Sequence, residues 1–198
     1  MMIVAFCVML TLCAGCGRQP GIEALSADSV VVAFGDSLTS GAGAEKDESY
    51  PAVLAEMLAC RVVNAGVSGE DTTAGLRRLP SVLDKEQPDL VILCHGGNDI
   101  LRKQDRDRTI TNLSAMISMV QHMGADIILL AVPRPGLRLR PAPFYADLAS
   151  KHGIPLDAES LSEILSTRSL KSDQIHPNAD GYRQLAASLY AMIQKSQR

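Results

Sequence analysis

The chain has 198 residues, a length typical of one domain and too short for two full hydrophobic cores. Its 19 Lys and Arg against 22 Asp and Glu give a net charge of −3, the wrong sign for a protein built around phosphate backbones, so we expect no nucleic-acid partner. Hydrophobic residues make up 46% of the chain, which indicates a folded domain, whereas aromatic residues make up 4% and Trp is absent, which disfavours sugar binding by ring stacking.

The N-terminal segment has the pattern of an export signal. Residues 1–15 are uncharged and mostly apolar, but the run ends at Arg18-Gln19-Pro20-Gly21, short of the roughly 20 apolar residues that a membrane-spanning helix needs. Small residues precede a cysteine in Leu12-Cys13-Ala14-Gly15-Cys16, a stretch that resembles a bacterial lipoprotein signal. We therefore expect residues 1–16 to be a signal peptide, Cys16 to carry a lipid, and residues 17–28 to form a short linker.

This pattern also predicts the location of the protein. We expect export, with the protein held as a lipoprotein on a bacterial membrane that faces the periplasm. A cleaved signal with an unmodified Cys16 is the alternative, and the protein would then be soluble in the periplasm. A lipid anchor on Cys16 is the only membrane contact that we expect.

Residues 29–198 alternate between strand and helix patterns. Continuous apolar runs, typical of strands buried on both faces of a parallel sheet, occur at 29–34, 61–64, 90–94, 127–132 and, as a short fifth, 154–156. Helical patterns lie at 51–58, which has a proline in its first turn, and at 110–123 and 178–194, which each carry one apolar stripe. The alternation predicts an α/β fold: a flavodoxin-like, three-layer α/β/α domain with about five parallel strands and helices on both faces.

Two cysteines, Cys60 and Cys94, lie beside or within these apolar runs. An exported protein can form a disulfide, but cysteines in such positions are more typical of free buried thiols. We expect both to be unpaired.

Polar motifs stand next to the predicted strands, where an open α/β sheet binds its ligands. Gly35-Asp36-Ser37 follows the first strand, Asn64-Ala65-Gly66 closes the second, His95-Gly96-Gly97-Asn98 follows the third, and Asp173-Gln174-Ile175-His176 precedes the last helix. In this order the four segments resemble the SGNH subgroup of the GDSL hydrolases, whose four letters match Ser37, Gly66, Asn98 and His176. The resemblance spans roughly residues 30–190 and is strongest to the single-domain branch of arylesterases, thioesterases and lysophospholipases.

The residue types also make chemical sense as a catalytic triad. A serine hydroxyl is a weak nucleophile until a base takes its proton, so Ser37 needs a histidine within hydrogen-bond reach. His176 is the preferred base, because Asp173 three residues upstream can hold one ring nitrogen and stabilise the imidazolium. The rival base is His95, for which we expect a structural role beside the pocket.

Ser68 is the second-choice nucleophile. The run Gly66-Val67-Ser68-Gly69-Glu70 begins like a nucleophile elbow, but Glu70 occupies the place of the second glycine in Gly-x-Ser-x-Gly.

The resemblance also implies an oxyanion hole. It assigns the hydrogen-bond donors to the backbone N–H groups of Ser37 and Gly66 and to the side-chain amide of Asn98. Asp36 and Asp99 are expected to hold their loops together. Because the sequence has neither a glycine-rich phosphate-binding run nor the spacing of zinc ligands, we expect no cofactor and no metal.

The loop at residues 133–144 contains four prolines, which exclude a helix until about Phe144. It leaves the fourth strand on the edge that carries the motifs. We expect Leu137, Leu139 and Phe144 to wall an acyl groove, and Arg134, Arg138 and Arg140 to attract anionic head groups; a solvated surface loop fits the same residues.

Together these features predict a monomeric serine esterase that acts through an acyl-enzyme. Its expected substrates are small-molecule or lipid esters: acyl, aryl or lysophospholipid esters, and also thioesters. One alternative is a carbohydrate O-deacetylase of the same superfamily, which the scarcity of aromatic residues disfavours. The other is an inactive binding module on this fold, which the complete triad disfavours.

Overall fold

The first strand of the domain is β1 (Val30–Gly35), whose apolar run is buried on both faces. The computed structural model describes residues 21–198 and places β1 within a five-stranded parallel sheet of order β2-β1-β3-β4-β7. The other strands are β2 (Arg61–Gly66), β3 (Leu90–Cys94), β4 (Asp126–Leu130) and β7 (Leu156–Asp157). This is the flavodoxin-like sheet predicted from the sequence, with the expected short fifth strand at its edge.

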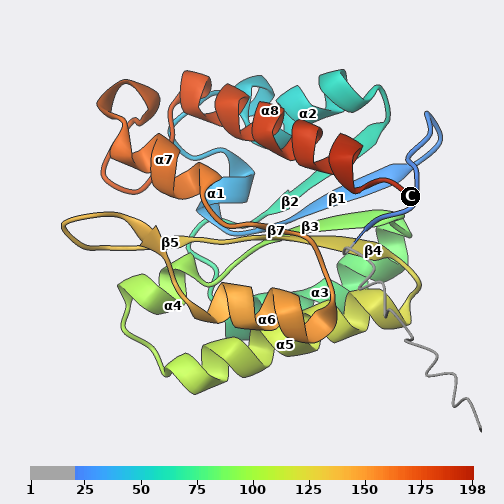
Figure 1. Ribbon diagram of the computed structural model, residues 1–198, viewed down its shortest axis with the longest axis horizontal. Coiled ribbons are helices and arrows are strands. Elements are labelled where there is room, and N and C mark those ends of the chain that lie inside the picture. The colour runs from blue at the N-terminus through green and yellow to red at the C-terminus, as the bar shows by residue number, and fades with distance from the viewer. Residues whose placement is uncertain (1–20) are drawn as a thin grey trace, which may run out of the picture.

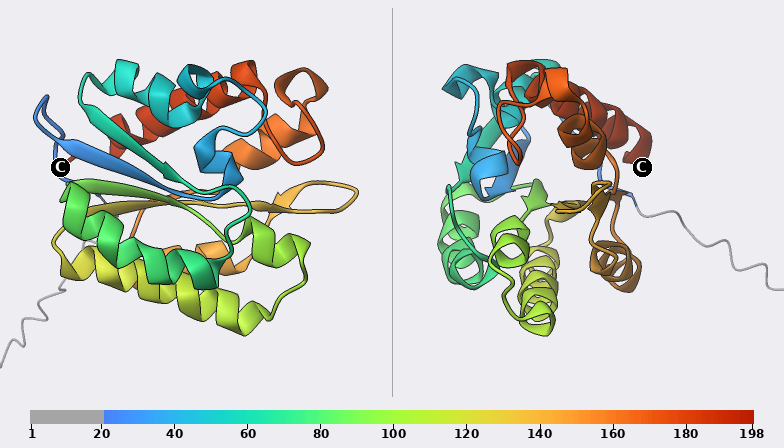
Figure 2. Two further views of the ribbon diagram at one scale, coloured as in Figure 1. Left: turned by 180° about the vertical axis from the view of Figure 1, so that it is seen from behind. Right: turned by 90° about the vertical axis from the view of Figure 1, so that its left-hand side faces the viewer.

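Helices cover both faces of the sheet and complete the three layers (Figures 1 and 2). One layer holds α1 (Ser37–Ser40), α2 (Tyr50–Leu58), α7 (Ser160–Ser166) and α8 (Ala179–Ser196). The other holds α3 (Thr72–Glu86), α4 (Gly97–Leu101), α5 (Arg106–His122) and α6 (Phe144–His152). Among residues 21–198, no helix combines the length and the hydropathy needed to cross a membrane.

Helix α3 has no counterpart among the predicted elements. Its buried apolar positions are sparse, with Leu79 and Leu83 the large ones, and Pro80 interrupts its interior. Its start is stabilised by Asp71, whose side chain accepts a hydrogen bond from the backbone N–H of Ala74 at 2.9 Å. A weak apolar stripe with an internal proline hides such a helix from periodicity arguments.

The carboxyl ends of three neighbouring strands meet at one edge of the sheet. Gly35 at the end of β1 pairs with Gly66 in β2 and with Cys94 in β3. The chain changes face here, because α2 connects β1 to β2 on one side of the sheet and α3 connects β2 to β3 on the other. This is the topological switch point at which open α/β sheets bind ligands, and it brings three of the predicted motifs together.

The predictions for the N-terminal segment fall partly outside the described residues. The predicted signal peptide at 1–16, with Cys16, lies outside the described residues, as do residues 17–20 of the predicted linker. Residues 21–28 contact the domain: Ile22 is fully buried and its backbone N–H donates to the Ser196 carbonyl at 2.9 Å. This part of the expected linker is therefore attached to the domain beside its C-terminus (Figure 1).

Both cysteines of the described domain are free thiols, as predicted. Cys94 is fully buried in β3, and burial raises the pKa of its thiol. Cys60 lies at the surface end of β2 and is only half-buried, so its burial is less complete than expected.

Candidate active site

Ser37 stands at the point where β1 gives way to α1. The preceding glycine is required by packing, because a Cβ on Gly35 would lie 2.2 Å from the Cys94 carbonyl oxygen. Asp36 caps the short helix by accepting a hydrogen bond from the Leu38 backbone N–H at 3.0 Å. The Asp36 side chain is buried, and this burial raises the pKa of its carboxyl group. The turn thus presents the Ser37 hydroxyl at the edge of the sheet, and Asp36 holds the loop as expected.

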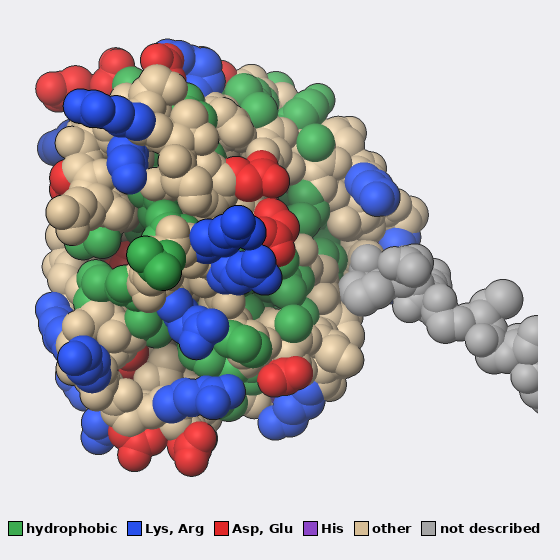
Figure 3. All heavy atoms as spheres, turned by 60° about the vertical axis from the view of Figure 1, so that its left-hand side comes forward, with side chains coloured by type: hydrophobic (Ala, Val, Ile, Leu, Met, Phe, Trp, Pro, Cys, Tyr) green, Lys and Arg blue, Asp and Glu red, His purple; other side chains and the backbone are tan. Residues whose placement is uncertain are grey.

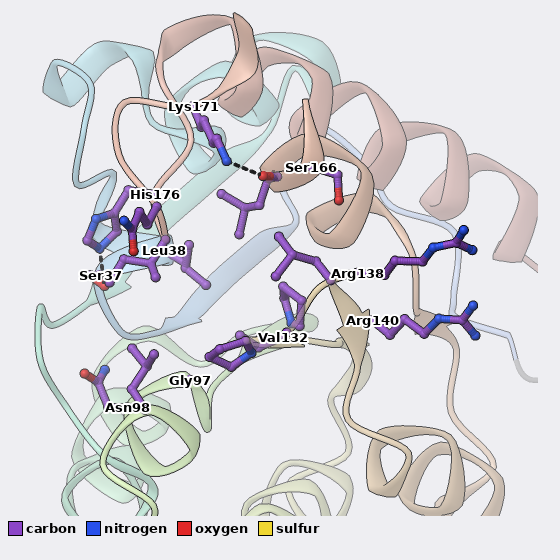
Figure 4. Close-up of a pocket in the computed structure, with 18 of the residues that line it drawn as sticks. Ser37, Leu38, Gly97, Asn98, Val132, Arg138, Arg140, Ser166, Lys171 and His176 are labelled. Atoms are coloured by element: carbon purple, nitrogen blue, oxygen red, sulfur yellow. Dashed lines mark hydrogen bonds between the residues drawn. The ribbon is translucent and has the colours of Figure 1, made fainter. Parts of the chain in front are cut away.

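The hydroxyl of Ser37 contacts His176, which lies 139 positions further along the chain. The distance from His176 Nε2 to Ser37 Oγ is 3.0 Å (Figure 4). His176 Nδ1 lies 2.8 Å from Asp173 Oδ2. The three predicted triad residues therefore form one continuous chain of hydrogen bonds from carboxylate to hydroxyl.

Backbone contacts of its own turn orient Asp173. Its Oδ1 atom accepts hydrogen bonds from the backbone N–H groups of Ile175 and His176, both at 2.8 Å. Burial alone would raise the pKa of Asp173, but the hydrogen bonds from the His176 ring and from these two N–H groups lower it. The carboxyl group is therefore ionised at neutral pH, as a partner of an imidazolium needs to be.

The three predicted oxyanion donors lie at the same edge but differ in their present partners. Gly66 is held close to α1, because a Cβ there would lie 2.2 Å from the Ser40 backbone nitrogen. Its N–H donates to the side-chain oxygen of Asn64 at 3.0 Å, whereas the Ser37 N–H makes no hydrogen bond within residues 21–198.

Both amide hydrogens of Asn98 are occupied. Its Nδ2 donates to the Glu70 backbone carbonyl at 3.0 Å and to Asp36 Oδ2 at 3.2 Å. A side-chain amide has two hydrogens, so Asn98 can donate to a substrate oxyanion only by sharing or releasing one of these acceptors. The bond to Asp36 is the longer of the two.

The two alternatives to the triad residues lie elsewhere. His95 is fully buried, with Nε2 at 3.2 Å from Glu70 Oε2 and Nδ1 accepting from the Gly96 backbone N–H. The Ser68 hydroxyl lies 2.9 Å from the hydroxyl of Ser40 and contacts no histidine of the described chain. These contacts fit the structural role expected for His95 and give Ser68 no base.

The contacts of Asp99 fit the role expected for it, which is to hold neighbouring loops together. It is buried, its Oδ2 accepts from the Thr72 backbone N–H at 2.9 Å, and its Oδ1 accepts from the hydroxyl groups of Thr72 and Thr109. The carboxylate thereby joins the starts of α3, α4 and α5.

A pocket of about 910 Å³ opens beside Ser37 and His176 (Figure 4). Leu137 and Leu139, two of the predicted acyl-groove residues, line it, as do Arg138 and Arg140. The two arginines lie at the end of the pocket opposite Ser37 and His176. Figure 3 shows the face of the molecule where hydrophobic and basic side chains lie next to one another.

The prediction for Phe144 was wrong. Phe144 does not line the pocket of Ser37; it is buried at the start of α6, where its ring packs against Tyr145 with 4.5 Å between centroids. It borders a separate hollow of about 210 Å³ together with Arg134. The reason is a short antiparallel ladder between β5 (Pro133–Arg134) and β6 (Arg140–Pro141), which folds the loop back. Pro133 and residues 135–140 line the pocket, whereas Phe144 lies beyond the ladder.

Several pocket residues have no signal in the sequence. They come from α7 and the segments on either side of it, and they include Glu159, Leu165, Ser166 and Lys171. Gln174 and Ile175, which lie between the predicted Asp173 and His176, also line the pocket. Lys171 is fixed near the pocket by a hydrogen bond from its Nζ to the Leu165 carbonyl at 3.0 Å. These residues line the pocket because the C-terminal segments pass over the edge of the sheet, which no local pattern reveals.

Comparisons with known proteins agree with this geometry. The sequence profile of the GDSL-like lipase/acylhydrolase family matches residues 33–184. An arylesterase of Vibrio mimicus is 30% identical over 168 residues, which cover 79% of this chain and 84% of that protein. The thioesterase 1/protease 1/lysophospholipase L1 of Escherichia coli strain K12 is 32% identical over 166 residues, covering 80% of this chain and 79% of that protein.

A solved structure shows the same architecture. The crystal structure of the psychrotrophic esterase EstA from Pseudoalteromonas sp., inhibited by monoethylphosphonate, matches with a TM-score of 0.74 and 25% identity. The match covers 85% of this chain and 98% of that one.

Proposed function

Since this chain belongs to the GDSL-like lipase/acylhydrolase family and is a serine hydrolase that acts on esters, we propose that Ser37 is its nucleophile, His176 its general base and Asp173 the residue that orients the base. The observation that carries this proposal is the continuous chain of contacts, 3.0 Å from Ser37 to His176 and 2.8 Å from His176 to Asp173. A nucleophile, a base and an orienting group within hydrogen-bond reach are the parts that acyl transfer to serine requires.

The reaction then proceeds in two balanced halves. His176 Nε2 accepts the hydroxyl proton as Ser37 Oγ bonds to the ester carbonyl carbon, and the imidazolium returns that proton to the leaving alcohol as the ester C–O bond breaks. A water molecule then attacks the acyl-enzyme, gives its proton to His176, and releases the carboxylic acid while Ser37 regains its hydrogen. Asp173, ionised at neutral pH, stabilises the imidazolium in both halves.

We propose that the Ser37 and Gly66 N–H groups and the Asn98 amide stabilise the tetrahedral oxyanion. One such donor typically contributes about 3–4 kcal/mol to the transition state. The unpartnered N–H of Ser37 is available at once, whereas Asn98 exchanges its longer bond to Asp36 for the oxyanion.

The pocket supports substrates with an acyl chain. Leu137 and Leu139 line the pocket and offer apolar surface to an acyl chain, and Arg138 and Arg140 at the end opposite Ser37 offer positive charge to an anionic group. We propose that small acyl or aryl esters, thioesters and lysophospholipids are accepted. The test is a series of p-nitrophenyl esters of increasing chain length: Leu139→Asp is expected to shift the preference toward shorter chains, and an unchanged preference would contradict the acyl role.

A fluorophosphonate probe tests the nucleophile, because it labels only an activated serine. We expect labelling of the wild-type protein, loss of labelling and of ester hydrolysis in Ser37→Ala, and full retention of both in Ser68→Ala. Mass spectrometry of the labelled peptide identifies the modified residue. Labelling at any residue other than Ser37 would overturn the assignment.

We also propose that the protein is exported as a monomer and is anchored by a lipid on Cys16. The support is the motif of small residues before Cys16, preceded by an uncharged apolar run. Growth with an alkyne-tagged fatty acid is expected to label the wild-type protein and to leave Cys16→Ser unlabelled. Equal labelling of the two proteins would refute the anchor, and light scattering of the purified domain measures its oligomeric state.

A further inference from the structure

Behind the predicted oxyanion hole lies a cluster of Glu70, Arg78 and His95, which the mechanism above does not use. Arg78 donates two hydrogen bonds to the Glu70 carboxylate, from Nε at 2.8 Å and from Nη2 at 2.6 Å. His95 Nε2 lies 3.2 Å from the same carboxylate. The Glu70 side chain is 7% exposed, that of Arg78 is 24% exposed and that of His95 is fully buried, so water has little access to the Glu70 carboxylate.

Arg78 also holds the peptide unit that carries the Gly66 donor. Its Nη2 donates to the Ala65 carbonyl oxygen at 3.0 Å, and to the Gly35 carbonyl at 3.4 Å. The Ala65 carbonyl and the Gly66 N–H belong to one planar peptide, so fixing the oxygen fixes the direction of the N–H. The Gly35 carbonyl belongs to the peptide that immediately precedes the Ser37 turn.

Glu70 in turn holds the second donor. Its backbone carbonyl accepts a hydrogen bond from Asn98 Nδ2 at 3.0 Å. Its side chain is anchored to Arg78, so one residue connects the Asn98 amide with the guanidinium that orients the Gly66 peptide. Two of the three proposed donors are therefore positioned by a single ion pair, whose carboxylate is buried.

From these contacts we propose that Arg78 and Glu70 are positioning residues of the oxyanion hole, which act through the Gly66 peptide and the Asn98 amide. The inference rests on the proposed function. It gives a role to Glu70, the residue that breaks the nucleophile-elbow pattern in the sequence, and to His95, which supports the carboxylate from the other side.

The residue types fit this task. A guanidinium is planar, stays charged and offers five donors in a rigid fork, so Arg78 can reach a carboxylate and two carbonyls at once. The Cζ atom of Arg78 also lies 4.2 Å from the centroid of the Phe34 ring, and this cation–π contact helps to fix the orientation of the guanidinium. A lysine keeps the charge but lacks the second donor, Nε, that fixes the fork on the Glu70 carboxylate, so its ammonium is not held in this orientation toward the Ala65 carbonyl.

The experiment compares Arg78→Lys with Arg77→Lys, the same substitution at the neighbouring, exposed position of α3. Each protein is titrated to completion with a fluorophosphonate, so that rates refer to active sites, and its melting temperature is measured. Inhibition by an alkyl trifluoromethyl ketone, which forms a hemiketal oxyanion on serine, is then compared with inhibition by the matching methyl ketone, which stays trigonal.

We expect Arg78→Lys to lower kcat per active site at least about tenfold and to lower the affinity for the trifluoromethyl ketone by a similar factor. KM and the affinity for the methyl ketone should stay within about twofold, because ground-state contacts are untouched. Arg77→Lys should match the wild type in every measurement. If Arg78→Lys does not fold, Glu70→Gln, which keeps the shape and removes the charge, is expected to show the same selective loss.

The inference would be overturned if kcat and the affinity for the trifluoromethyl ketone were unchanged, or if the affinities for the two ketones fell equally. A fall in kcat explained entirely by fewer titratable sites would also overturn it, since that is the result of a purely structural role. The Ser37→Ala variant distinguishes failure of this inference from failure of the proposed function. An active Ser37→Ala protein would refute the assignment of Ser37 as the nucleophile, whatever the result for Arg78→Lys.

Discussion

The carboxylate of Asp173 offers a sharp test of the proposed triad, through a comparison of Asp173→Asn with Asp173→Ala. In the wild type, Oδ2 faces His176 Nδ1 at 2.8 Å while Oδ1 accepts two backbone N–H groups. An asparagine can keep its oxygen on those N–H groups, which turns its NH2 group toward Nδ1. The ring must then carry its proton on Nε2, facing Ser37, and cannot act as a base in that tautomer.

The size of each loss follows from the exposure of the site. The Asp173 side chain is 54% exposed, so water partly screens its charge. Two unit charges about 4 Å apart attract by about 1 kcal/mol in water and about 4 kcal/mol near a protein surface. At about 1.4 kcal/mol per tenfold, Asp173→Ala should lower kcat by about 5- to 10³-fold. Asp173→Asn adds the wrong tautomer and should reach about 10⁴-fold, the loss seen for this change in serine proteases.

The assay is hydrolysis of p-nitrophenyl acetate near neutral pH, where the lowered pKa of Asp173 keeps the wild-type carboxylate charged. Melting temperatures serve as the control, since Asp173→Asn retains the backbone contacts of the turn. If Asp173→Asn were as active as the wild type, or clearly more active than Asp173→Ala, the orienting role would be refuted.

Three further predictions use other parts of the structure. Gly66→Ala should lower kcat by about 10²-fold or more, because its Cβ would lie 2.2 Å from the Ser40 nitrogen and force the donor peptide to move; normal activity would contradict the assigned donor. Burial alone would raise the pKa of Glu70, but hydrogen bonds from Arg78 and His95 lower it from 4.5 to about 2. The wild type should therefore have a higher free energy of unfolding than Glu70→Gln above about pH 4.5, and this difference should vanish toward pH 2, as measured by urea unfolding. A difference that grows as the pH falls would refute this. Phe144→Leu should leave the chain-length preference unchanged, because Phe144 lies outside the pocket of Ser37, and a shift would show that the two hollows communicate.

Local sequence patterns predict the sheet and, with the resemblance to the SGNH hydrolases, the side chains that meet at its edge. The apolar run that ends at Gly35 predicts a strand buried on both faces, and such a strand must lie inside a parallel sheet. In a parallel sheet all carboxyl ends share one edge, so the positions of Ser37 and Asn98 after their strands predict that they are neighbours. Asp173 and His176 are three positions apart on one turn, and their contact is therefore a local property.

The tertiary structure alone decided which atoms each group contacts. The amide of Asn98 binds Glu70 and Asp36, which lie 28 and 62 positions upstream, and no pattern within a segment encodes such distant pairs. The same holds for Arg78 on the Ala65 carbonyl, because α3 itself was not predicted. Phe144 was misplaced for a related reason: composition shows that a loop is stiff and apolar, but the direction of its side chains depends on how the loop folds back onto its own strand.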